Sequence, residues 1–256
     1  MQLNNFKKLN PSALLFLLGF IGVLTMPPLI PQLLAIIEEK PPLPLVVIQV
    51  IATIQSSVLL FLMVWLGTVY AKRVGLTAPV IVAIARSEDF IRFLKPQILP
   101  ALLGGVAAGI FLVAFYAMVS PFLPAEFITA AEKLTPPWYT KLLYGGITEE
   151  ILIRWGLMSF FVWAFYRLTQ QKNTDIKTHN YMLAIVVSSL IFGLGHLPIA
   201  LSLSPTVTVT LVSYIIIGNA VFGFVAGYLY WKRGLECAIL AHMVAHVTMI
   251  FAIKFV

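Results

Sequence analysis

The stretch Thr148-Glu149-Glu150-Ile151-Leu152-Ile153-Arg154 lies near the middle of a long apolar run, from about Trp138 to Tyr166. A run of this length and composition predicts a membrane-spanning helix. Each ionisable side chain in such a helix costs roughly 2.5–3.5 kcal/mol on insertion scales and by default marks function. The stretch therefore indicates both a membrane-embedded fold and the place where its chemistry lies.

Helical spacing separates the roles of the three ionisable residues. Glu150 and Arg154 are four residues apart with the acid first, which is the favourable order for an ion pair on one helix face. Glu149 projects about 100° away from Glu150 and has no partner at this spacing. We expect a structural ion pair between Glu150 and Arg154, and a second carboxylate, on Glu149, that is left for another task.

The composition supports a membrane protein. The chain has 256 residues, of which 60% are hydrophobic and only 11% are charged, whereas soluble domains carry about 25% charged residues. The net charge of +7 does not indicate nucleic-acid binding, because the basic residues flank apolar runs as membrane topology signals do. We therefore predict an all-α, polytopic helical bundle in a lipid bilayer.

Seven apolar runs predict about seven transmembrane helices, at roughly residues 11–37, 43–70, 98–119, 138–166, 181–200, 205–230 and 235–253. Pro27, Pro28 and Pro31 predict a kink in the first helix. Segments 71–95 and 125–134 mix charged with apolar residues, which predicts one or two interfacial helices.

The basic residues are distributed unevenly between the two sides of this bundle. A cytoplasmic N-terminus places on the cytoplasmic side Lys7, Lys8, Lys72, Arg73, Arg86, Arg92, Lys95, Arg167, Lys172, Lys177, Lys232 and Arg233. The opposite side receives Lys40, Lys133, Lys141 and Lys254. This asymmetry predicts a cytoplasmic N-terminus, and it suits a multi-pass protein of a bacterial plasma membrane. A eukaryotic endomembrane is the alternative.

Polar groups within the predicted spans lie mainly in the C-terminal half. His242 and His246 are four residues apart and share one helix face. Together with His196 and Glu149 from other spans, they predict one polar cavity. Such a set can hold a water molecule and take its proton, which produces a nucleophile for an amide carbonyl. Alternatively, the same four side chains bind a divalent metal such as zinc.

Three motifs follow one another on the late spans: Glu149-Glu150-x-x-x-Arg154, Phe192-x-x-x-His196 and His242-x-x-x-His246. In this order they resemble the CPBP family of CAAX proteases and bacteriocin-processing enzymes, also called the Abi family. The resemblance covers roughly residues 138–253. It implies an intramembrane endopeptidase that cleaves a peptide or a C-terminal segment of a membrane-associated protein.

The resemblance also implies roles for individual residues. Glu149 is the general base, His196 and His242 orient water or stabilise the oxyanion, and the pair Glu150–Arg154 fixes the helix. The family usually has Asn or Asp at the position of His246. A neutral imidazole also donates a hydrogen bond, so this difference is compatible with activity, with metal binding, or with a member that does not cleave.

This interpretation also concerns the domain organisation, the cofactor and the alternative functions of the protein. We expect one membrane domain, residues 1–256, with N-terminal spans and interfacial segments in 1–136 and a catalytic core in 137–256. The cofactor is either none or a divalent metal, which corresponds to a glutamate-dependent hydrolase or a metalloprotease. A non-catalytic scaffold or immunity protein and a proton-coupled transporter are the alternative functions. The oligomeric state is not predicted.

Overall fold

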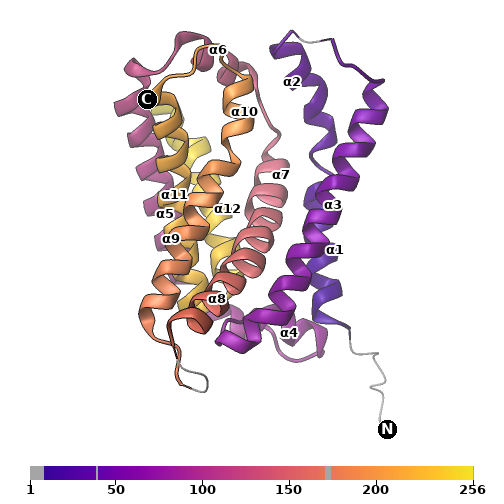
Figure 1. Cartoon of the computed structure of the whole chain (residues 1–256), viewed down its shortest axis with the longest axis vertical. Coiled ribbons are helices and arrows are strands. Elements are labelled where there is room, and N and C mark those ends of the chain that lie inside the picture. Colours follow the sequence, from indigo (N-terminus) through magenta and orange to yellow (C-terminus); the bar gives the residue numbers. More distant parts are fainter. Residues whose placement is uncertain (1–8, 39, 171–173, 256) are drawn as a thin grey trace.

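The computed structural model describes residues 9–38, 40–170 and 174–255, and helices without strands make up this described part (Figure 1). Lys7, Lys8 and Lys172, which contributed to the predicted topology, lie outside the described residues.

Seven helical segments in the described part are long and apolar enough to cross a membrane: Pro11–Ile36, Leu45–Val74, Ile91–Phe122, Trp138–Thr169, Thr178–Ser202, Val209–Arg233 and Leu235–Ala252. The predicted all-α polytopic bundle is therefore confirmed. Large apolar side chains cover its outside, as for Val46 and Phe61, which are 68% and 60% exposed. Such a surface suits contact with lipid tails.

The first span is kinked where its prolines predict. Helix α1 covers Pro11–Val23, a 3₁₀ turn η1 covers Pro27–Leu29, and α2 covers Ile30–Ile36. Proline lacks an N–H group and interrupts the helical hydrogen bonds. The Gln49 side chain on α3 (Leu45–Tyr70) donates to the Pro27 carbonyl at 3.0 Å, so the kink is held from the neighbouring helix.

The segment between the second and third spans differs from the prediction. It contains a 3₁₀ turn η2 (Ala71–Val74) and the short helix α4 (Pro79–Ala85), and then α5 (Ile91–Val119) begins well before the expected start near residue 98. The charges of Arg92 and Lys95 lowered the apparent hydropathy of this first turn. Long basic side chains nevertheless extend to the membrane surface from a helix that has already begun.

The remaining elements follow in chain order: η3 (Ser120–Phe122), α6 (Ala125–Lys133), α7 (Trp138–Thr140), η4 (Lys141–Glu149), η5 (Ile151–Met158), α8 (Ser159–Thr169), α9 (Thr178–Gly195), α10 (Leu197–Ser202), α11 (Val209–Arg233), α12 (Leu235–Ala252) and η6 (Ile253–Phe255). The elements from α7 to α8 form one continuous helix, Trp138–Thr169, which we call the motif helix. The short helices α4 and α6 lie within the two segments that were predicted to be interfacial.

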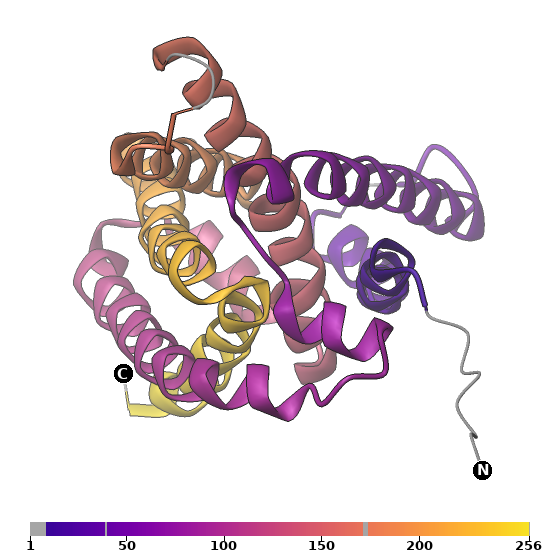
Figure 2. The ribbon, with the colours of Figure 1, turned by 90° about the horizontal axis from the view of Figure 1, so that it is seen from below.

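The motif helix runs between two groups of helices (Figures 1 and 2). Helices α1 and α3 lie on one side of it, and α5, α9, α11 and α12 lie on the other. A hydrogen bond of 2.7 Å from the Thr148 hydroxyl to the Gly19 carbonyl joins the motif helix to α1. Because the motif helix lies between these two groups of helices, Glu149 and Glu150 are near side chains of both groups.

The glycine-rich third span packs closely, as its small residues predict. A Cβ atom added to Gly105 would lie 2.5 Å from the Ala241 carbonyl oxygen, and one added to Gly109 would lie 2.9 Å from that of Ala245. Both contacts are on α12. Glycine thus allows α5 to approach the backbone of the helix that carries His242 and His246.

Segments with predicted cytoplasmic residues lie at one end of the bundle. Helix α4 and the end of α8 are at the lower end in Figure 1, whereas α2, α6 and α10 are at the upper end. The Leu235 amide donates to the Thr77 carbonyl at 3.0 Å, which places the α11–α12 turn beside the start of α4. Lys72, Arg86 and Arg233 are carried by these lower segments.

Candidate active site

The motif helix has an unusual backbone where it carries the glutamates. The segments η4 and η5 on either side of Glu150 are π-helical, with wider turns than an α-helix. Side-chain hydroxyls follow this wider spacing: Ser159 donates to the Arg154 carbonyl five residues earlier at 3.4 Å, and the Thr148 hydroxyl, whose proton points to Gly19, lies 3.3 Å from the Leu143 carbonyl five residues earlier. π-Helical turns are rare and often occur at functional sites. The structure therefore has π-helical turns where we expected a regular α-helix.

Glu150 and Arg154 form the ion pair that their spacing predicts. The Arg154 Nε atom lies 3.2 Å from Glu150 Oε2, and neither side chain has any exposed surface. The guanidinium also donates to the Gly223 carbonyl at 3.0 Å and lies 4.9 Å from the centre of the Phe192 ring. The pair thus connects the motif helix to α9 and α11.

Glu150 also contacts His242, a contact that the sequence interpretation missed. Glu150 Oε1 lies 2.7 Å from His242 Nδ1. Because an ionised carboxylate only accepts hydrogen bonds, the proton lies on Nδ1 and the neutral ring presents an unprotonated Nε2. That Nε2 atom lies 4.0 Å from Glu149 Oε2, so the two glutamates approach opposite nitrogens of one imidazole.

His196 is held by its own helix. It follows the last residue of α9, where the fifth span breaks before α10, and its Nδ1 lies 2.8 Å from the Phe192 carbonyl. A carbonyl can only accept, so Nδ1 donates and Nε2 is unprotonated in the neutral ring. The Phe192 ring packs edge-to-face on the imidazole at 4.7 Å between centres. Its own sequence motif therefore orients His196.

His246 lies beside His242 with its ring nearly parallel, at 4.8 Å between ring centres and 16° between planes. A Cβ atom added to Gly145 would lie 2.6 Å from His246 Nε2. The glycine on the motif helix thus makes room for this imidazole. Among the described residues, no hydrogen-bond partner fixes either ring nitrogen of His246, in contrast to His196 and His242.

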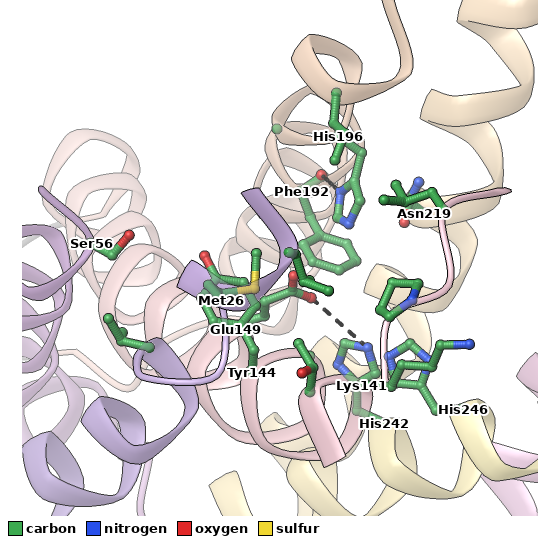
Figure 3. A pocket seen from close by; sticks show the side chains of 18 of the residues that line it. Met26, Ser56, Lys141, Tyr144, Glu149, Phe192, His196, Asn219, His242 and His246 are labelled. Carbon is green, nitrogen blue, oxygen red and sulfur yellow. Dashed lines mark hydrogen bonds and ion pairs between the residues drawn. The ribbon is translucent and has the colours of Figure 1, made fainter. Parts of the chain in front are cut away.

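The four predicted residues line one cavity of about 530 Å³. Figure 3 shows Glu149, His196, His242 and His246 around this space, with Phe192 and Asn219 between them. Most of the remaining lining is apolar and comes from both groups of helices, including Val23, Met26, Leu29, Leu33, Leu112 and Met249. The arrangement is a largely apolar pocket with a few convergent polar groups, as binding sites commonly are.

Three polar lining residues were missed or interpreted differently from the sequence. Lys141 and Tyr144 precede Glu149 on the motif helix, and both line the cavity. The signal available in the sequence was their position on the same helix, eight and five residues before Glu149. Asn219, expected to join helices, donates to the Ile215 carbonyl of its own helix at 2.8 Å and borders the cavity.

The metal alternative has no support in this geometry. No group of three or more His, Cys, Asp or Glu side chains within the described ranges is arranged to hold a metal ion. The Nδ1 bonds of His196 and His242 do not bear on this question, because metal-binding histidines also donate from one ring nitrogen and bind through the other. A metal ion at this site stays a prediction, for which the described side chains show no grouped set of donors.

Comparison with known proteins gives one family match, which lies in the C-terminal half of the chain. Residues 131–248 match the sequence model of the Rce1-like family, described as type II CAAX prenyl endopeptidase Rce1-like. No curated protein and no solved structure matches the chain. The match includes all three motifs and confirms the resemblance drawn from them. Residues 131–248 are therefore similar to the Rce1-like family of type II CAAX prenyl endopeptidases.

Proposed function

We propose that this protein is an intramembrane endopeptidase that cleaves a C-terminal segment of a membrane-associated protein, with Glu149 as the general base. The family match supports this class of activity. The observation that carries the assignment of Glu149 is its position in the cavity, 4.0 Å from the unprotonated Nε2 of His242. A gap of this size between two polar groups suits a bridging water molecule.

The proposed reaction uses that water as the nucleophile. Glu149 takes a proton from the water while its oxygen attacks the carbonyl carbon of the peptide, which gives a tetrahedral intermediate. The protonated Glu149 then transfers this proton to the departing nitrogen as the C–N bond breaks. The first products are a new carboxylic acid, which keeps the second proton of the water, and a new amine, and Glu149 returns to its ionised form. The acid then gives its proton to the amine, which leaves a carboxylate and an ammonium group.

The histidines divide the supporting work according to their hydrogen bonds. His242 and His196 donate from Nδ1 to protein groups, so their Nε2 atoms accept from water and orient it. Of the two roles that the family resemblance gives these residues, this geometry favours water orientation. His246 is free to donate, so we assign to it the oxyanion contact that an Asn or Asp supplies in the family.

The substrate enters beside lipid in this proposal. The cavity extends between the kinked first span and α9 to α12, and its lining is mainly apolar. Such a lining suits a peptide segment that carries or borders a lipid anchor. We place the N-terminus on the cytoplasmic side of a bacterial plasma membrane, on the basis of the basic residues.

The test is product analysis in lipid vesicles. Purified protein is incubated with a prenylated peptide that ends in a CAAX sequence, and the fragments are identified by mass spectrometry. The proposal predicts one internal cleavage and two fragments. An intact peptide, with the protein still able to bind it, would instead support the non-catalytic scaffold, for which His246 in the place of Asn or Asp is the motivating feature.

A further inference from the structure

Asn219 carries the one amide side chain among the described residues that line the cavity. Its Nδ2 atom donates to the Ile215 carbonyl oxygen of its own helix, α11, at 2.8 Å. A carbonyl oxygen only accepts hydrogen bonds, so this contact fixes which end of the amide is the nitrogen. The other end, Oδ1, is therefore a hydrogen-bond acceptor held in one orientation. Within the part of the chain that the structure describes, no group donates to it.

The packing of α9 against α11 places this oxygen in the cavity wall. A Cβ atom added to Gly193 on α9 would lie 2.6 Å from the Ile216 carbonyl oxygen on α11, so the two helices are in backbone contact there. Asn219 follows Ile216 by three residues and lies within one helical turn of that contact. Figure 3 shows the Asn219 side chain beside His196, directed into the cavity.

Asn219 is also about one helical turn from the reacting groups. Phe222, three residues later on α11, lies 4.2 Å from His242 between ring centres. Three residues of an α-helix rise about 4.5 Å, and an extended peptide advances about 3.3–3.6 Å per residue. A substrate whose reacting carbonyl lies between Glu149 and His242 therefore passes Asn219 one or two residues from the cleaved bond.

A peptide that enters this cavity loses the water that bound its backbone. A backbone N–H group left without an acceptor is costly in an apolar setting, so within the membrane the protein has to supply the partner. The wall offers acceptors on Glu149 and on the Nε2 atoms of His196 and His242, but the proposed reaction uses these for water. The Asn219 oxygen is an acceptor that water activation does not use.

We propose that Asn219 Oδ1 accepts a hydrogen bond from one backbone N–H group of the substrate, within two residues of the cleaved bond. Asn219 is a substrate-binding residue in this proposal, and it fixes the register of the peptide relative to Glu149. The inference rests on the proposed function and narrows its substrate class. The substrate binds as an extended chain, and the residue that meets Asn219 is not proline, which has no N–H group.

The experiment compares a prenylated peptide with a series of its esters, in each of which an oxygen atom replaces one backbone N–H group near the cleaved bond. This exchange removes a donor and keeps the shape of the chain. Binding is measured in vesicles with E149Q, so the result does not depend on turnover. One ester is expected to bind about tenfold more weakly than the parent peptide, because Asn219 Oδ1 is left buried without a donor.

Removing the acceptor should remove this difference. In E149Q/N219L the ratio between the parent peptide and that ester should fall close to one, because leucine offers the N–H group no acceptor. E149Q/N219A, which adds no bulk, should give the same ratio. Gln55 provides the matched control, because it is an exposed amide side chain on α3 that does not line the cavity. E149Q/Q55L should keep the tenfold ratio.

Equal binding of the parent peptide and all its esters by E149Q would overturn the proposal. An unchanged ratio in both E149Q/N219L and E149Q/N219A would overturn it as well, because the N–H group would then meet another acceptor. Failure of the wild-type protein to cleave a peptide that it binds would instead count against the proposed function, while the ester ratios still test Asn219.

Discussion

The side chains of Glu150 and His242 are joined by a hydrogen bond of 2.7 Å between Oε1 and Nδ1. The same carboxylate contacts Arg154 through its other oxygen. Glu150 therefore has two effects: it neutralises a buried guanidinium, and it fixes the proton of His242 on the nitrogen that faces away from Glu149. A carboxylate behind a histidine in this way sets both the orientation of the ring and its tautomer.

The first prediction concerns stability. E150Q leaves the Arg154 guanidinium buried without its counter-charge, and removing one partner of a buried ion pair costs about 3–5 kcal/mol. Thermal unfolding in detergent should show a clear decrease in stability for E150Q. The double variant E150Q/R154M should recover much of the loss, because it removes the unpaired charge. Equal stability of E150Q and wild type would contradict the buried pair.

The second prediction concerns the hydrogen bond itself. In variants that remain folded, E150Q should lower kcat because the amide no longer holds the His242 proton on Nδ1. H242A should lower kcat as well, and the double variant E150Q/H242A should lose little more than H242A alone. A double-mutant cycle on kcat measures this coupling. Fully additive losses would mean that Glu150 acts only through Arg154.

The third prediction uses the space beside His246. G145A places a methyl group where only 2.6 Å separates it from His246 Nε2, so the imidazole must move and activity should fall. G218A is the matched control, since the nearest atom to its added Cβ is 3.6 Å away, an ordinary contact. Cleavage rates of the two variants check this. Equal activity of both would show that the position of His246 does not matter.

The fourth prediction concerns the role of His246. H246N supplies an amide donor and should keep most of the activity, whereas H246A removes the donor and should lower kcat by about 100-fold or more, as loss of an oxyanion donor does. Cleavage rates of the two variants measure the difference.

The metal content of the purified wild-type protein and of H246A is measured alongside their cleavage rates. We expect cleavage to survive chelators, because the four candidate ligands are not arranged around a common point. Stoichiometric zinc that disappears in H246A would contradict the oxyanion role and restore the metal alternative.

The sequence predicted the fold where a single physical rule dominates. Long apolar runs cross membranes, so the seven spans and the kink at Pro27 were predictable. The start of α5 at Ile91 was not predictable in this way. The charge of Lys95 lowers the mean hydropathy of this segment, although a lysine side chain in a membrane-spanning helix can extend to the membrane surface.

The site was predictable at the level of residue types and less so at the level of contacts. The order of motifs pointed to Glu149, His196, His242 and His246, and helix periodicity pointed to the Glu150–Arg154 contact. The bond from Glu150 to His242 joins residues far apart in the chain, and no periodicity within one helix reveals it. Lys141 was assigned only a topological role, because its place in the cavity depends on the packing of α12 against the motif helix.

The central claim is that Glu149 activates the water that cleaves the peptide. The most direct test compares the cleavage rate of wild type with that of E149Q, using E126Q on the surface helix α6 as the matched control. The side chain of E149Q keeps nearly the same shape but cannot accept the proton, so the rate should fall by about 100-fold or more while unfolding temperature and peptide binding are retained. E126Q should cleave at the wild-type rate. Cleavage by E149Q at the wild-type rate would contradict the assignment of the base.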